Sequence, residues 1–420
     1  MISTPEQQQI GDEYLLNLFL TPEGVADPAP WYKKLREDMP IFQSSNGAIF
    51  LSRFDDCHSV FRDNRFGKGD QSGPGGSMLP REESPEVVAF RIEVNEARTQ
   101  TSPSLLFLDP PDHTRLRGLV NRAFTPRRIE DMRMSIRDLT EECLDELAEE
   151  NGGDAMEILG FLPVNVIGEL VGVPRSDWNY FRPLVNDGVA NLEASPTLEE
   201  LKASHAAFTE MGEYFRQLLH ERKKNPKNDL ISALIEVEES GDRISEDEVV
   251  STVILLFAAG METTQNLIGN GLAALFQHPE QYKLLWDNPD LVPSAVEEML
   301  RWDSPVQLDG RTALEKTEID GIQIEEGQSV VTLIGAANRD PEKFEDPDNF
   351  LVRRDEGPPL SFASGIHFCL GANLARAEGQ EMFAGLIRRF SSVQQAGELE
   401  QRGRMTLRGF KTVPVSVTER

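Results

Sequence analysis

The stretch FASGIHFCLG, residues 362–371, surrounds a cysteine with small residues, a histidine and a glycine. A structural thiol would pack as a small apolar side chain and would need no such surroundings. A disulfide would need a partner, and a zinc site would need further ligands nearby. A helical pattern follows from Leu370, so the sulfur of Cys369 is expected to meet the amides at the N-terminus of that helix. Those donors and the helix dipole favour a thiolate.

The other cysteines give no disulfide or metal-binding pattern. Cys57, Cys143 and Cys369 lie far apart, and no pair has the CxxC spacing. The N-terminus lacks the basic and apolar regions of a signal peptide, and the longest apolar run, about residues 249–261, is shorter than the ~20 residues that span a bilayer. We expect a cytoplasmic protein that does not cross a membrane.

The charge of the chain limits its possible partners. Among 420 residues, 42 Lys and Arg stand against 71 Asp and Glu, which gives a net charge of −29. Nucleic acids and anionic membranes are bound by clustered positive charge. The composition therefore argues against both as ligands.

Helical periodicity dominates the sequence. Alternating patterns with glycine turns between residues 306 and 334, and again at the C-terminus, predict short strands. Residues 68–86 are rich in Gly, Pro and Ser and predict a long loop. No repeat or linker divides the chain, so we expect one domain, residues 1–420, mainly α with a minor β-sheet region. Helices are expected at roughly 126–150, 156–172, 176–192, 198–224, 229–239, 246–278, from 293 onward, and 370–390.

The longest predicted helix carries AAGMETT at residues 258–264. A glycine inside a helix costs about 0.5–1 kcal/mol relative to alanine, so it suggests a close approach to the backbone. Glu262 either reaches solvent from a buried helix or, with the hydroxyl of Thr263, delivers protons to a reaction site. The pattern alone does not decide between these two readings.

Two further patterns carry little weight in isolation. Glu298 and Arg301 share a helix face at i, i+3, and such a pair is usually an exposed surface pair of small energetic value. His113 and Arg117 stand at i, i+4 and suit a ligand with two carboxylates, although a solvated basic stripe is the commoner arrangement.

Two further positions stand out, Arg311 and Cys369, and the cysteine indicates a cofactor. Arg311 lies among apolar and turn residues, with Asp309 as its obvious acidic neighbour. A lone thiolate in an apolar pocket, without a second protein ligand, indicates coordination of a haem iron.

These motifs match a known family. FASGIHFCLG resembles the cysteine-ligand loop of the cytochrome P450 haem-thiolate monooxygenases, and AGMETT resembles their oxygen-activating helix. Glu298-x-x-Arg301 resembles the family's ExxR pair, and NFLVRR resembles the segment with its third partner, here Arg354. The match holds in order from about residue 29 to the C-terminus. It implies the cytochrome P450 fold, with residues 1–28 as an N-terminal extension and residues 68–105 as a substrate-side loop region.

The resemblance implies haem b between the helices at 246–278 and 370–390, with Cys369 as the axial iron ligand. Glu262 and Thr263 would be the catalytic proton-delivery pair. The other implied cofactor-binding residues are His113, Arg117, Arg311 and His367 at the propionates, Phe362 beside the sulfur, and Gly371 and Ala259 lining the cofactor.

One residue departs from the family pattern. Ala363 stands where the loop normally has its first glycine. If this position requires a positive φ, alanine costs roughly 1–2 kcal/mol there. We do not expect this departure to prevent haem binding.

The implied reaction inserts one oxygen atom from O2 into a small apolar or amphipathic organic substrate by hydroxylation, epoxidation or oxidative dealkylation. Electrons would come from NAD(P)H through a separate ferredoxin and its reductase, to an enzyme that acts as a monomer. Two alternatives are a peroxide-using haem-thiolate enzyme and a non-catalytic haem sensor or carrier. The Glu262–Thr263 pair argues against both.

Four arginines suggest where an electron donor docks. Arg115 and Arg122 are predicted on the helix face opposite His113, and Arg127 and Arg128 follow in the next helix. We expect them to form a local positive patch for an acidic ferredoxin, since complementary charge speeds association.

Overall fold

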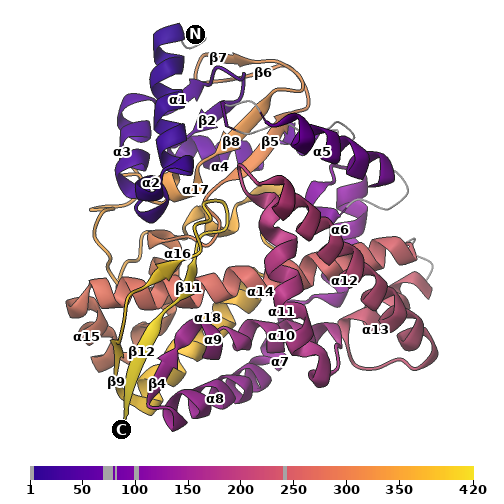
Figure 1. Ribbon diagram of the computed structural model, residues 1–420, viewed down its shortest axis with the longest axis vertical. Coiled ribbons are helices and arrows are strands. Elements are labelled where there is room, and N and C mark those ends of the chain that lie inside the picture. The colour runs from indigo at the N-terminus through magenta and orange to yellow at the C-terminus, as the bar shows by residue number, and fades with distance from the viewer. Residues whose placement is uncertain (1–3, 70–78, 81–82, 99–103, 240–243) are drawn as a thin grey trace.

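The computed structural model describes residues 4–69, 79–80, 83–98, 104–239 and 244–420. The long helix α14, Glu246–Gln277, crosses the middle of the molecule, and other helices pack around it (Figure 1). Its neighbours include α10 (Phe161–Val171), α12 (Leu198–Lys224), α16 (Val292–Trp302) and α18 (Ala372–Arg389). The predicted fold class, mainly helical with small sheets, is confirmed.

The start of α14 is encoded locally. Ser245 caps the helix by accepting a hydrogen bond from the amide of Glu248, and the side chain of Glu248 bonds back to the amide of Ser245. This capping box satisfies two amides that would otherwise have no partner. The apolar residues that follow are buried against neighbouring helices on nearly every side. The capping box therefore sets where α14 begins, and the apolar run that follows places the helix in the core.

The remaining helices surround α14 or the larger sheet. They are α1 (Pro5–Leu20), α2 (Pro22–Ala26), α3 (Ala29–Asp38), α4 (Phe54–Arg62), α5 (Pro85–Arg98), α6 (Asp112–Ala123), α7 (Pro126–Asp131), α8 (Arg133–Glu149), α9 (Ala155–Ile158), α11 (Trp178–Gly188), α13 (Leu230–Glu239), α15 (Pro279–Asp287) and α17 (Ile334–Ala337). Among the described helices, none is both long enough and apolar enough to cross a bilayer.

The largest sheet joins the N-terminal region to the strands predicted between residues 306 and 334 (Figure 1). Its order is β1-β2-β8-β5-β3, and β2 runs parallel to β8 while the other pairs are antiparallel. A three-stranded sheet has the order β4-β12-β9, and two hairpin-like pairs complete the set. The strands are β1 (Ile41–Gln43), β2 (Ile49–Leu51), β3 (Phe66–Gly67), β4 (Gly152–Asp154), β5 (Asp309–Ala313), β6 (Thr317–Ile319), β7 (Ile322–Ile324), β8 (Ser329–Thr332), β9 (Phe390–Gln395), β10 (Glu400–Gln401), β11 (Phe410–Thr412) and β12 (Pro414–Glu419).

The structure refines three expectations. The helix predicted at 126–150 is divided at Met132 into α7 and α8. Residues 85–98 of the predicted 68–105 loop region form α5, while part of that region lies outside the described residues. The first residues are more than an extension, because Leu15 and Leu18 of α1 are fully buried in an apolar cluster with Phe42 and Phe50 of the sheet.

Candidate functional site

Cys369 lies in a tightly folded loop that precedes α18. The loop contains two short 3-10 turns, Leu360–Phe362 and Gly365–His367, and the Cys369 amide donates to the carbonyl of Phe362 over 3.0 Å. Gly365 has a φ of +71°, and a Cβ there would come within 2.0 Å of the Phe61 carbonyl oxygen. The glycine thus permits the close approach of α4 that holds the loop in place.

Ala363 adopts the positive φ that its place in the pattern suggested. Its φ is 55° and its ψ is −157°, a conformation that glycine enters at lower cost than alanine. This extended positive-φ region is almost confined to glycine, so the cost for alanine is about 1–3 kcal/mol. The loop nevertheless keeps its amide-to-carbonyl bond between Cys369 and Phe362.

Cys369 differs from the other two thiols in its surroundings. Burial raises its pKa, but the amides of Gly371 and Ala372 and the charges of Arg117 and Arg376 act in the opposite direction. Burial raises the pKa of Cys143 to about 12. Cys369 therefore has amide donors and cations that favour its thiolate, whereas Cys143 packs as an apolar side chain.

Three predicted cofactor-binding side chains converge near the cysteine loop. The rings of His113, from α6, and His367 lie 4.2 Å apart between centroids. Nε2 of each histidine and Nη2 of Arg311, from β5, are buried and have no hydrogen-bond partner among the described residues. Buried donors are seldom left unpaired, since each costs about 1–3 kcal/mol. These atoms fit a ligand that supplies acceptors.

The charge at this cluster identifies the kind of acceptor. Burial, followed by the positive charges of Arg311, His113 and Lys68, lowers the pKa of His367 to about 3. Burial and the charge of Arg117 likewise lower the pKa of His113. Arg311, Lys68 and Arg117 therefore concentrate positive charge beside two neutral histidines, and this charge favours an anion. The two carboxylates of a haem fit this donor set.

Arg117 is placed differently from those three residues. Its guanidinium donates to the carbonyl of Phe368, next to the cysteine, and is partly exposed. It therefore braces the cysteine loop and adds positive charge beside the sulfur. Phe362 is buried in the same loop, and the guanidinium of Arg376 stacks 4.5 Å from the centroid of its ring.

Thr263 and Ala259 occupy an accessible strip of the otherwise buried helix α14. Ala259 is exposed and Thr263 partly exposed, whereas Ala258, Met261 and Glu262 are buried. The Thr263 hydroxyl donates to the Ala259 carbonyl over 2.6 Å. This bond leaves the hydroxyl oxygen able to accept a hydrogen bond from a water or substrate at the strip.

Glu262 does not contact Thr263. Its carboxylate is fully buried and accepts both of its short hydrogen bonds, 2.9 and 3.0 Å, from Nη1 of Arg402. The same guanidinium also reaches Gln265 and, on α11, Asn186. The sequence did not reveal Arg402 because 140 residues separate it from Glu262 and no short-range pattern links them.

Glu298 and Arg301 form a buried pair, so the expectation of an exposed surface pair is wrong. Two bonds of 2.7 and 2.8 Å join them, and Arg354 donates to the same carboxylate over 3.1 Å. Arg301 also donates to the carbonyls of Asn338, Pro347 and Asn349. The triad fixes α16 to the chain that leads into the cysteine loop, as the resemblance implied.

Comparison with known proteins agrees with this geometry. Residues 194–412 match the family model of cytochrome P450. The chain is 38% identical over 398 residues to the polyketide biosynthesis cytochrome P450 PksS of Bacillus subtilis, with 92% of this chain and 95% of the relative covered. It is 36% identical to a vitamin D(3) 25-hydroxylase of Pseudonocardia autotrophica, with 94% of each chain covered. The chain belongs to the cytochrome P450 family.

Solved P450 structures share the whole fold. The crystal structure of P450BioI in complex with a fatty-acyl-ligated acyl carrier protein superposes with a TM-score of 0.84 at 33% identity, over 94% of this chain and all of that one. Mycobacterium smegmatis CYP164A2 gives a TM-score of 0.85 at 35% identity, over 97% of this chain and 100% of that one. The protein is accordingly a haem b monooxygenase that acts on small organic molecules and receives electrons from redox partners.

The arginines expected to guide an electron donor are only partly available in this P450. Arg115 pairs with Glu248 of α14 and lies 3.6 Å from Asp112, so its charge is already compensated. Arg122 and Arg127 are exposed, and Arg128 is half-buried. Asp112 lies three residues before Arg115 on α6, but the second partner, Glu248, lies on α14 and could not be read from the sequence of α6.

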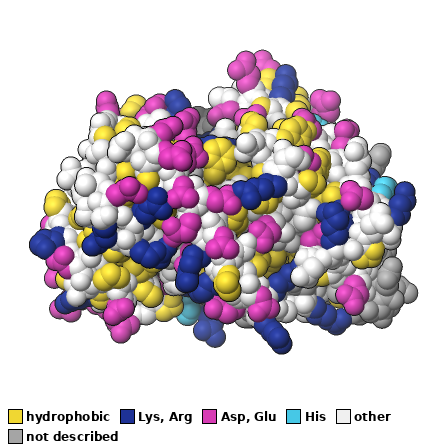
Figure 2. Space-filling view, turned by 90° about the horizontal axis from the view of Figure 1, so that it is seen from below, with side chains coloured by type: hydrophobic (Ala, Val, Ile, Leu, Met, Phe, Trp, Pro, Cys, Tyr) yellow, Lys and Arg dark blue, Asp and Glu magenta, His cyan; other side chains and the backbone are white. Residues whose placement is uncertain are grey.

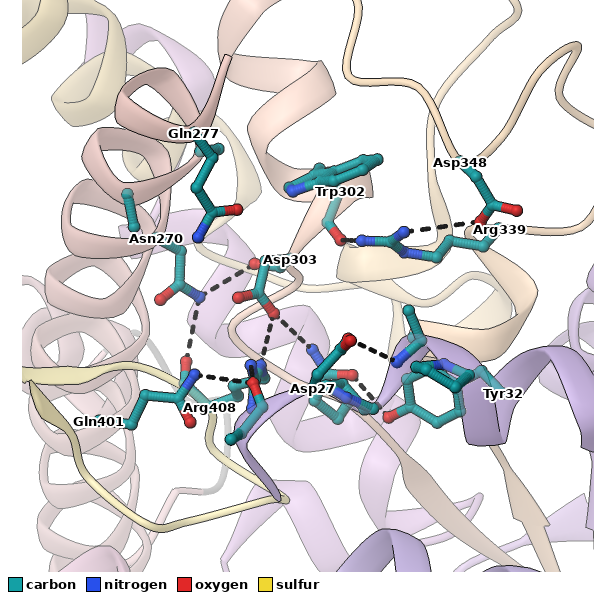
Figure 3. Close-up of a pocket in the computed structure, with 18 of the residues that line it drawn as sticks. Asp27, Tyr32, Asn270, Gln277, Trp302, Asp303, Arg339, Asp348, Gln401 and Arg408 are labelled. Carbon is teal, nitrogen blue, oxygen red and sulfur yellow. Dashed lines mark hydrogen bonds and ion pairs between the residues drawn. The ribbon is translucent and has the colours of Figure 1, made fainter. Parts of the chain in front are cut away.

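A cavity of about 660 Å³ lies beside the C-terminal half of α14, beyond Thr263 (Figure 3). Its polar side chains largely bind one another. Arg408 donates to Asp303 over 2.8 Å, and Arg339 stacks 3.8 Å from the ring centroid of Trp302. None of the predicted site residues lines it. These contacts join the N-terminal segment to the helices and do not point to a ligand.

Proposed function

We propose that this P450 hydroxylates, epoxidises or dealkylates a small apolar or amphipathic molecule, with electrons delivered from NAD(P)H by a ferredoxin and its reductase. One observation carries the proposal: the Cys369 loop lies near three buried donors, on His113, His367 and Arg311, that have no hydrogen-bond partner among the described residues. Bound there, haem with a thiolate ligand supplies the chemistry that cleaves the O–O bond of O2. The protein's own task is to orient substrate and to control protons and water.

The residues near the cofactor have distinct proposed roles. Cys369 is the axial ligand, and the N-terminal amides of α18 stabilise its negative charge. His113, His367 and Arg311 bind the propionates, while Arg117 braces the loop from its edge. The residues proposed to line the macrocycle are Phe362, Gly371 and Ala259.

Thr263 and Glu262 are proposed to deliver protons in two stages. The partly exposed hydroxyl of Thr263 orients a water at the accessible strip of α14. Glu262, the second member of the pair, is bound by Arg402 away from this strip. Because Arg402 binds this buried carboxylate, Glu262 reaches the water at Thr263 only when the ion pair opens.

The substrate class rests on the accessible walls and on the family. By resemblance to the family, the proposed walls of the substrate site are Ala259, Val306 and the segment after α11, where small or apolar side chains are common. Relatives with more than 30% identity include proteins named for polyketide biosynthesis and for vitamin D(3) hydroxylation. That range supports an apolar or amphipathic substrate of modest size. We propose that the enzyme acts as a single chain in the cytoplasm, where its three free cysteines stay reduced.

The proposed ferredoxin docks over the cysteine loop. Phe368, next to the proposed iron ligand, is 42% exposed, and the exposed Arg127 lies on α7. Arg115 is left out of this patch because Glu248 and Asp112 compensate it. Local positive charge is needed here, because the overall charge of −29 repels an acidic partner.

Turnover with defined electron sources tests the reaction. We expect product from a substrate that shifts the Soret band when NAD(P)H, ferredoxin reductase and ferredoxin are supplied. The ferredoxin-supported rate should fall with added salt, since exposed charges are screened over ~8–10 Å at moderate ionic strength. Product formed with hydrogen peroxide alone would favour the peroxide-using enzyme. Absence of product with either source, despite tight haem binding, would favour a sensor or carrier.

A further inference from the structure

Lys68 is a buried cation whose position the proposed reaction does not explain. It follows β3, which pairs with β5, and its side chain is 7% exposed. Its Nζ donates to Oδ1 of Asp309 over 2.8 Å and to the carbonyl of Gly310 over 3.0 Å. Lysine is seldom buried to this degree unless it is paired, and here the partner lies two residues from Arg311.

The backbone around Lys68 is held by a second acid. The amides of Lys68 and Gly69 both donate to the carboxylate of Asp109 over 2.8 Å. The carbonyl of Asp109 in turn accepts from the amide of His113 over 2.9 Å. Lys68 therefore connects the two segments that carry His113 and Arg311, both of which we assign to the propionates.

The charges in this network explain what Lys68 contributes. Asp309 binds Lys68 on one side and Nη1 of Arg311 on the other. With both cations present, the group of three carries one net positive charge. Without Lys68, the carboxylate of Asp309 would neutralise Arg311, which is 3% exposed and whose Nη2 has no partner among the described residues.

The pKa of Asp309 agrees with this arrangement. Although burial acts to raise the pKa of Asp309, the charges of Lys68 and Arg311 hold it below its usual value. The carboxylate is thus an anion shared between two cations. The guanidinium of Arg311 also lies 5.2 Å from the centroid of the Phe61 ring, which limits its movement on another side.

We propose that Lys68 is a positioning residue for the cofactor: by sharing the carboxylate of Asp309, it keeps Arg311 oriented and net positive toward a haem propionate. The inference rests on the proposed role of Arg311. It gives the start of the 68–105 region a direct influence on how tightly haem is held. Lys68 itself needs no contact with the cofactor for this role.

The rate of haem loss from the holoenzyme to excess apomyoglobin tests the proposal. In Lys68→Met, which keeps a long aliphatic side chain without the charge, we expect haem loss to become roughly ten- to a hundredfold faster, the usual scale for losing a partner of a cofactor-binding group. Lys316→Met removes an exposed lysine that pairs with Glu325 at 2.6 Å, and it should leave the rate unchanged. Lys68→Arg should stay near the wild-type rate.

A double variant separates the charge effect from a general loss of structure. Asp309→Asn in the Lys68→Met background removes the excess negative charge, so haem loss should slow again toward the wild-type rate. A Lys68→Met rate equal to wild type, or a double variant that loses haem at least as fast as Lys68→Met, would overturn the proposal. Arg311→Gln tests its premise: if that variant also keeps the wild-type rate, the propionate assignment of Arg311 fails first.

Discussion

Thr263 and Glu262 are neighbours in sequence whose side chains lie in different environments. Thr263 bonds to the Ala259 carbonyl at an accessible strip, and Glu262 is fully buried against Arg402. Successive residues of a helix are separated by about 100°, so adjacent side chains do not face each other. In the proposed mechanism the two residues therefore act in series and not as one contacting pair.

Thr263→Ala should separate electron use from product formation. Without the hydroxyl, the water at the strip loses the side chain that orients it, so protons are no longer delivered in the geometry that the reaction needs. We expect normal haem content and reductant consumption, with several-fold less product per electron and more hydrogen peroxide released. Thr263→Ser, which keeps the hydroxyl, is the matched control and should remain well coupled. Equal coupling in the alanine variant and wild type would remove Thr263 from proton delivery.

At the scale of single residues, the sequence predicted the placement of residues that belong to a short, recognisable motif. The role proposed for Cys369 rests on its loop motif, and Ala363 adopted the positive φ that the pattern implied. Arg402 and Lys68 escaped prediction, because their acidic partners are 140 and 241 residues away. Long-range ion pairs depend on how elements pack, and no spacing rule in the sequence reports them.

Among the elements, the segment after α11 is fastened to the loop between β10 and β11. The carboxylate of Glu193 accepts the amides of Met405, Thr406 and Leu407 over 3.0–3.1 Å. Arg404 adds a bond to the carbonyl of Asn186 on α11. Three charge-assisted hydrogen bonds to one carboxylate hold this wall of the proposed substrate site against the loop.

Glu193→Ala should loosen that wall. Hydrogen bonds to a charged group contribute about 1.5–3 kcal/mol each, and the loss of the carboxylate leaves three amides to be hydrated. We expect both binding and release of an azole that ligates the iron to accelerate several-fold in stopped-flow absorbance measurements. Glu199→Ala, at an exposed position early in α12, should leave both rates unchanged. If the two variants behave alike, Glu193 does not control access.

The elements themselves were largely predictable, with informative exceptions. The long helix α14 and the strands between residues 306 and 334 followed from periodicity and turn residues. The break at Met132 did not, because apolar periodicity continues across it. The burial of Glu298 and Arg301 was also hidden, since a helix pattern shows that two side chains share a face and not what covers that face.

At the scale of the whole molecule, the net negative charge does not form one continuous acidic surface on the face drawn in Figure 2. On the face drawn in Figure 2, Lys and Arg side chains lie scattered among Asp and Glu side chains. Many of the basic side chains are paired, as Arg115 with Glu248 illustrates. The net charge calculated from the sequence therefore argued against nucleic acids and anionic membranes as ligands, but it did not locate a docking patch for a protein. That location depends on which cations the fold leaves uncompensated.

The central claim is that Cys369 supplies a thiolate to a haem iron, and the spectrum of the reduced carbon monoxide complex tests it most directly. The wild-type protein should show the long-wavelength Soret band that thiolate ligation produces and that gives the family its name. Cys369→Ser should lose this band, whereas Cys57→Ala and Cys143→Ala, which alter buried thiols elsewhere, should keep it. A thiolate spectrum that persists in Cys369→Ser would contradict the account.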